Sequence, residues 1–121
     1  MIVLRLDGWH AVPKARPRVT ARGTFMPPGY MDWKQETAIL LRKAHKAPPL
    51  EGILEVRVWI AATKKPRGDV DNLLGAVLDA GNGVVWVDDR TIGSAACSWV
   101  FPSETFPEGL VVEVETWNPR N

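Results

Sequence analysis

The stretch DVDNLLGAVLDAGNGVVWVDDRTI, residues 69–92, decides how this chain is understood, because it crowds together five aspartates. Neighbouring carboxylates repel one another and raise each other's pKa values, so a positive partner is expected among them. A hard divalent cation such as Mg²⁺ is the natural partner, since it prefers carboxylate oxygens and water. The stretch therefore predicts a metal site built from some of Asp69, Asp71, Asp79, Asp88 and Asp89.

The spacing of these aspartates suggests which of them meet. Asp69 and Asp71 lie two residues apart where an extended segment enters a helix, and alternate residues of an extended chain point to the same side. Asp88 and Asp89 form a turn after the next strand, and this turn returns beside the first pair if that strand runs back along the helix. We expect one aspartate of this pair, Asp89 in preference to Asp88, to complete a three-carboxylate Mg²⁺ site, with Asn72 orienting a water or a carboxylate.

Each aspartate also has a purely structural interpretation. Asp71 before a helix is a good N-cap, the pair Asp88 and Asp89 suits a turn, and Asp79 fits an exposed helix position. Taken together, with a basic segment directly before them, the carboxylates favour a functional cluster.

Composition narrows the class of protein. The 121 residues predict one domain, and 45 % hydrophobic and 24 % charged residues are typical of a soluble globular protein. No apolar run approaches the roughly 20 residues that span a bilayer, and the N-terminus does not resemble a signal peptide. The single Cys97 excludes an internal disulfide and a zinc site made of cysteines. We expect a cytoplasmic protein without a membrane partner.

Charge is distributed unevenly along the chain. Residues 1–50 carry nine Lys or Arg and three Asp or Glu, whereas residues 51–121 carry six and eleven. A basic half joined to an acidic half indicates a polyanionic partner, although a folded chain can also mix such charges on a solvated surface. The side chains expected to contact DNA phosphates are Lys14, Arg16, Arg18, Arg22, Lys64, Lys65 and Arg67.

Residue periodicity predicts an α+β domain over residues 1–121, with two helices packed on one mixed sheet. The expected strands cover residues 2–6, 53–61, 84–87, 91–101 and 110–117. The expected helices cover residues 33–46, with Asp32 as N-cap, and 72–80. Residues 8–29 form a long loop with short extended pieces, because Pro13 and Pro17 disfavour a helix.

The same residues carry a family resemblance. The pattern consists of DVDN at 69–72, VLDA at 77–80, NGVVW at 82–86 and DD at 88–89, preceded by VPK at 12–14 and RPR at 16–18. In this order and spacing, over roughly residues 5–100, the chain resembles the RusA-type Holliday junction resolvases, small endonucleases often carried by prophages. DxDN alone is a weak signal, but the whole combination is specific.

The resemblance implies a homodimer that binds four-way DNA junctions and nicks two strands symmetrically in recombination and repair. It implies Mg²⁺ as cofactor, with Mn²⁺ as a substitute. The family's catalytic carboxylates fall on Asp69, Asp71 and Asp89, and Asp88 is expected to assist at the metal. A two-fold dimer suits this activity, because a four-way junction has approximate two-fold symmetry.

One position departs from the family pattern. The family usually has a lysine one helical turn after the second aspartate of DxDN, and this chain has Gly75 there. Glycine also weakens a helix by about 1 kcal/mol relative to alanine. Either Lys64, Lys65 or Arg67 reaches in instead, or the chain is a branched-DNA binding protein that cuts weakly or not at all. A third hypothesis is an acidic metal-binding domain with no role on nucleic acids.

Overall fold

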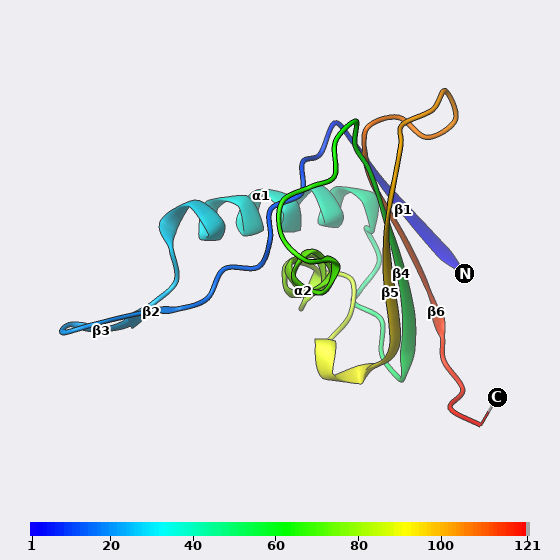
Figure 1. Cartoon of the computed structure of the whole chain (residues 1–121). Helices are drawn as coiled ribbons and strands as arrows, with labels where there is room; N and C mark the ends of the chain where they lie inside the picture. Colours follow the sequence, from blue (N-terminus) through cyan, green and yellow to red (C-terminus); the bar gives the residue numbers. More distant parts are fainter. Residues whose placement is uncertain (121) are drawn as a thin grey trace.

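A four-stranded mixed sheet forms one layer of the protein, as the computed structural model of residues 1–120 shows (Figure 1). The order across the sheet is β1-β6-β4-β5, and only β4 and β5 run parallel. The strands are β1 (Ile2–Asp7), β4 (Leu54–Ala61), β5 (Ile92–Val100) and β6 (Gly109–Thr116). Strands were predicted close to all four of these positions, and the mixed sheet confirms the α+β class.

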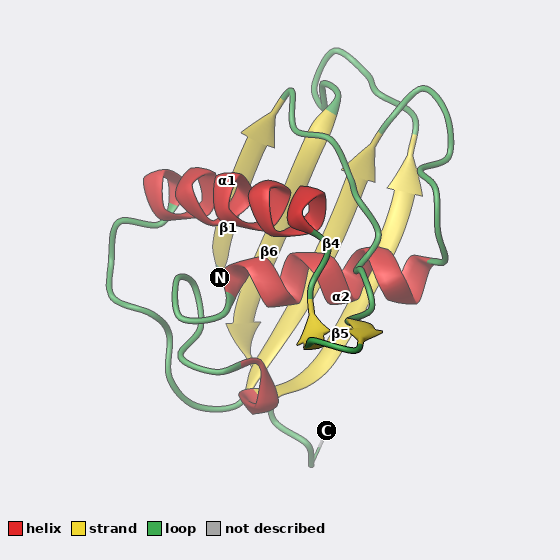
Figure 2. Ribbon diagram, turned by 90° about the vertical axis from the view of Figure 1, so that its left-hand side faces the viewer, coloured by secondary structure: helices red, strands yellow, loops and turns green. Residues whose placement is uncertain are grey.

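Two helices, α1 (Pro28–Ala44) and α2 (Val70–Gly81), cover one face of this sheet (Figure 2). The alternation in β4 explains the arrangement, because Leu54, Val56 and Val58 are buried while Glu55 and Arg57 are only half-buried. Apolar side chains thus face the helices and polar ones face away, as one-sided burial of a sheet requires. Among residues 1–120, neither helix is long and apolar enough to cross a membrane.

Helix α2 connects the two parallel strands, so it is the crossover of a β-α-β unit. Leu73, Ala76, Val77 and Ala80 are buried, which is the helical spacing that the sequence predicts. The helix begins two residues earlier than expected, and Asp69 rather than Asp71 occupies the N-cap position. The residues that carry the DVDN pattern therefore form the first turn of a helix that is anchored on the sheet.

Helix α1 begins at Pro28, so the predicted N-cap at Asp32 is wrong. Proline suits the first helical position, because its φ angle is already helical and the amide hydrogen it lacks would have no partner there. Inside the helix, Thr37 and Leu41 are buried. The Trp9 indole donates a hydrogen bond of 3.0 Å to the Thr37 hydroxyl and so ties the segment after β1 to α1.

Residues 83–85 form a turn and Trp86 forms only isolated β-bridges, so the strand predicted over residues 84–87 is wrong. The turn is stabilised by Trp86, which is completely buried and donates from its indole nitrogen to the Leu78 carbonyl at 3.1 Å. The ring packs directly on the backbone of Gly81, where a Cβ would overlap it. Burial of this one large side chain overrides the strand preference of its neighbours.

We expect Trp86→Ala to lower the free energy of unfolding by about 3–5 kcal/mol, because it leaves a cavity beneath the end of α2. Urea unfolding followed by circular dichroism measures the change. Phe101→Ala is the matched control, because Phe101 is 70 % exposed and should cost under about 1 kcal/mol. Equal losses in the two variants would contradict this account of the turn.

A small hairpin, β2 (Arg18–Thr20) with β3 (Gly23–Phe25), projects away from the sheet and helices (Figure 1). All six of its strand residues are exposed. The sequence predicts short extended pieces in this region, and the hairpin confirms them. A two-stranded hairpin is at best marginally stable by itself, and this one buries none of its strand residues.

Candidate active site at the start of α2

Two free carboxylates mark the N-terminal end of α2. Asp69 has extended backbone at the N-cap position and its side chain caps no amide, while Asp71 lies in the first turn. Both residues are exposed, and among residues 1–120 neither forms an ion pair. Asp69 directly precedes the helix and Asp71 is its second residue, so both carboxylates lie at the same end of the helix. Their oxygens are available to a ligand.

The Asp88–Asp89 pair lies beyond the other end of α2. The twelve residues of the helix correspond to about 18 Å along its axis. After the helix, the Asp89 amide donates to the Asn82 side-chain oxygen at 3.1 Å, which holds Asp89 near the C-terminal end. The expected return of this turn beside Asp69 and Asp71 does not occur within one chain. Accordingly, residues 1–120 contain no group of three His, Cys, Asp or Glu placed to hold a metal.

Asp88 and Asp89 differ in how free their carboxylates are. The Asp88 carboxylate accepts from the Arg90 guanidinium at 2.7 and 3.0 Å and from the Arg90 amide at 3.0 Å. Arg90, through these contacts, lowers the pKa of Asp88 to about 2. Asp88 therefore caps the short helix η1 (Asp89–Thr91), whereas Asp89 forms no ion pair in the described part of the chain. Of the two, Asp89 is the freer ligand.

The N-terminal loop packs against the start of α2. The Lys14 amide donates to the Asn72 carbonyl at 3.1 Å. Pro13 approaches Gly68 so closely that a Cβ on Gly68 would meet its ring at 2.7 Å, and Gly68 also has φ = +90°. These contacts join the VPK pattern to the residue that precedes Asp69. Two segments more than 50 residues apart in sequence thus meet at the two free carboxylates.

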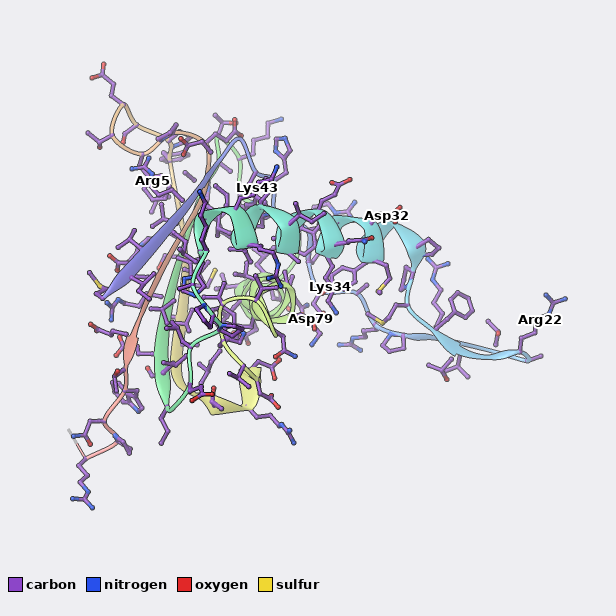
Figure 3. The ribbon with its side chains drawn as sticks, turned by 180° about the vertical axis from the view of Figure 1, so that it is seen from behind. Arg5, Arg22, Asp32, Lys34, Lys43 and Asp79 are labelled. Carbon is purple, nitrogen blue, oxygen red and sulfur yellow. The ribbon has the colours of Figure 1, made fainter. Side chains whose placement is uncertain are left out.

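The basic residues predicted to contact DNA are all exposed, and none forms an ion pair within residues 1–120. Lys65 instead donates to the Gly68 carbonyl at 3.0 Å, which stabilises the turn before Asp69. Arg22 lies at the far tip of the hairpin (Figure 3). The cations therefore extend from the start of α2 to the projecting arm. They comprise Lys14, Arg16, Arg18, Arg22, Lys64, Lys65 and Arg67.

A polar cluster between the two helices was missed by the sequence-based interpretation. The Tyr30 hydroxyl donates to the Asp79 carboxylate at 2.9 Å, and the Lys34 ammonium lies 3.3 Å from the same oxygen (Figure 3). Burial and then the contact with Asp79 raise the pKa of Tyr30. Asp79 is thus not an isolated surface residue, because its carboxylate links α2 to two residues of α1. Nothing in the local sequence pairs Asp79 with residues 49 and 45 positions earlier.

Comparison with known proteins gives one assignment. The family model described as "Endodeoxyribonuclease RusA" matches residues 9–115, which is most of the chain. No curated protein matches it.

Proposed function

This chain belongs to the RusA endodeoxyribonuclease family, whose members resolve Holliday junctions, and on that premise we propose that it nicks four-way DNA junctions by Mg²⁺-dependent phosphodiester hydrolysis. The observation that supports the metal dependence is the pair of exposed carboxylates of Asp69 and Asp71, which form no ion pair in the described part of the chain, residues 1–120. Recombination and repair intermediates of a host or prophage genome would be the substrates, and the cytoplasm the site of action.

The residues at the start of α2 fit a Mg²⁺ ion. Mg²⁺ usually retains several waters and is bound in nucleic-acid enzymes by one or two carboxylates together with phosphate oxygens. Asp69 and Asp71 would supply those carboxylates, with Mn²⁺ as a substitute, and Asn72 would orient a water or a carboxylate. The ion, when bound, would polarise the phosphodiester and lower the pKa of the attacking water.

The free cations support binding to the DNA backbone. A protein that neutralises several phosphates releases counterions, so its affinity falls steeply with salt. Seven exposed basic residues form no ion pair among residues 1–120, which suits this mode, and such contacts read shape rather than sequence. Pro13 and Pro17 stiffen the loop that carries Lys14 and Arg16 and leads into the hairpin with Arg18 and Arg22, which lowers the entropy lost on binding.

Symmetric cutting requires two sites, so we propose a homodimer with a two-fold axis. The separation of Asp89 from Asp69 and Asp71 within one chain is a second reason to propose a dimer. An axis that crosses α2 at right angles sets two copies of the helix antiparallel, with the start of one beside the end of the other. Asp69 and Asp71 of one subunit would then face the partner subunit's Asp89, and the predicted three-carboxylate set would form across the dimer.

A gel-shift and nicking experiment tests the proposed function. We expect the chain to bind a four-way junction at least tenfold more tightly than a linear duplex of the same sequence without metal, and to nick the junction once Mg²⁺ is added. Mapping should place the nicks at symmetric positions on opposing strands. No preference for the junction, or nicking of duplex at an equal rate, would contradict the proposal.

Gly75 favours one competing function, a branched-DNA binding protein that retains the fold but cuts weakly, because this position carries no side chain. In the same experiment this candidate shows tight junction binding with no nicks in Mg²⁺ or Mn²⁺. Absence of both binding and nicking would favour a metal-binding domain without a nucleic-acid role.

A further inference from the structure

The middle of α2 contains a glycine that its backbone does not require. Gly75 has no positive φ angle, so alanine or a longer residue would satisfy the helix equally well or better. A Cβ at Gly75 would lie 3.4 Å from Cδ and 3.9 Å from Cβ of Lys14. The side chain of Lys14 therefore lies across the helix at the position where another residue would project its own side chain.

Lys14 is held in this place by its neighbours. Its amide donates to the Asn72 carbonyl at 3.1 Å, and the preceding Pro13 packs against Gly68. The backbone of Lys14 is thus fixed on the first turn of α2, while its side chain is exposed and forms no ion pair among residues 1–120. A buried or paired lysine would be structural, but this ammonium is available to an external anion.

Lys14 lies on the same side of α2 as one of the two free carboxylates, that of Asp71. Residues 71 and 75 are four apart on α2 and share one face of the helix. The stem of Lys14 lies over residue 75, so its ammonium belongs to the surface on which Asp71 is displayed. Lys65 is less suited, because it donates to the Gly68 carbonyl. Lys64 lines a separate hollow of about 160 Å³ beside Trp9.

We propose that Lys14 is a catalytic residue whose ammonium contacts the phosphate being cut at Asp69 and Asp71, and that Gly75 provides the space for it. This inference rests on the proposed function. Hydrolysis forms a bond between a water oxygen and phosphorus and breaks the bond to one bridging oxygen, which leaves as a hydroxyl after taking up a proton. The attacking water loses its proton to solvent. Lys14 exchanges no proton and donates a hydrogen bond to a non-bridging oxygen, whose negative charge grows in the transition state.

Three variants test the role of Lys14. Lys14→Met keeps the length of the side chain and removes its charge, Lys14→Arg keeps the charge, and Lys46→Met is the control, because Lys46 is exposed beyond the end of α1. With enzyme saturating over junction, we expect Lys14→Met to lower the single-turnover nicking rate about a hundredfold. The dissociation constant measured without metal should rise only a few fold, as for the loss of one phosphate contact. Lys14→Arg should retain most of the rate and Lys46→Met all of it.

A double variant separates catalysis from loop structure. Gly75→Lys in the Lys14→Met background returns an ammonium to the same face of α2 from a different segment, so it should recover at least tenfold of the lost rate. Thermal unfolding of each variant checks that the fold is kept.

The outcomes are distinguishable from failure of the proposed function. If the unmodified chain nicks no junction, both proposals are overturned. If it nicks, and Lys14→Met has an unchanged rate at saturation or is not rescued by Gly75→Lys, only the role of Lys14 is overturned.

Discussion

Asp71→Asn is expected to lower the junction-nicking rate on the order of a thousandfold while junction binding is retained. The amide keeps the size of the side chain but removes the negative charge that would hold the proposed divalent cation. Folding should change little, because Asp71 is exposed and makes no ion pair within residues 1–120. Loss of its favourable interaction with the N-terminus of α2 costs about 0.3–1 kcal/mol, which a stable domain tolerates.

The measurement is a single-turnover nicking assay on a labelled four-way junction, together with a melting curve. Asp32→Asn is the matched control, because Asp32 is an equally exposed aspartate on the outer surface of α1 (Figure 3). It should cut at the normal rate. Nicking by Asp71→Asn within about fivefold of the unmodified chain would contradict a role of Asp71 at the proposed metal site.

Mixed dimers are expected to recover activity that neither parent variant has. In Asp71→Asn and Asp89→Asn homodimers both sites are damaged. If Asp89 acts on the partner subunit's site, a dimer of one chain of each kind has one site with two defects and one site that is intact. Such a dimer should nick one of the two strands at close to the normal rate per site.

Coexpression with two affinity tags and sequential purification isolates the mixed dimer. The matched control combines Asp69→Asn with Asp71→Asn. These two residues lie at the same end of the same helix, so every site of that mixed dimer keeps one defect and should stay inactive. An inactive dimer of Asp71→Asn with Asp89→Asn would show that the carboxylates do not combine across subunits.

The sequence alone was sufficient to predict the elements whose side chains alternate between the buried core and the surface. The apolar residues of β4 and the buried face of α2 repeat at strand and helix spacing, and both elements form where that spacing predicts them. Two local predictions were wrong because a competing effect acted. Pro28 starts α1 before Asp32, and the burial of Trp86 turns residues 84–87 out of a strand.

The sequence predicts which residues belong to the candidate site better than it predicts where they lie relative to one another. Asp69 and Asp71 follow from local spacing, and the structure places them at one end of α2 as a free pair. The place of Asp89 does not follow from the sequence, because nothing local says in which direction the chain leaves the helix. The contact between Lys14 and Gly75 joins residues 61 positions apart, which only the tertiary structure reveals.

The parallel pairing of β4 with β5 has a consequence for the order in which this protein matures. The crossover that joins the two strands spans residues 62–91 and contains the free carboxylates of α2. Closing such a long segment is slow compared with forming a hairpin. The entropy of closure is lost before the contacts between β4 and β5 form and compensate for it. In a nascent or partly folded chain, α2 and its aspartates are therefore not yet held in place by the complete sheet. We expect cutting competence to appear late in refolding, together with the pairing of β5, which would protect cellular DNA from an immature nuclease.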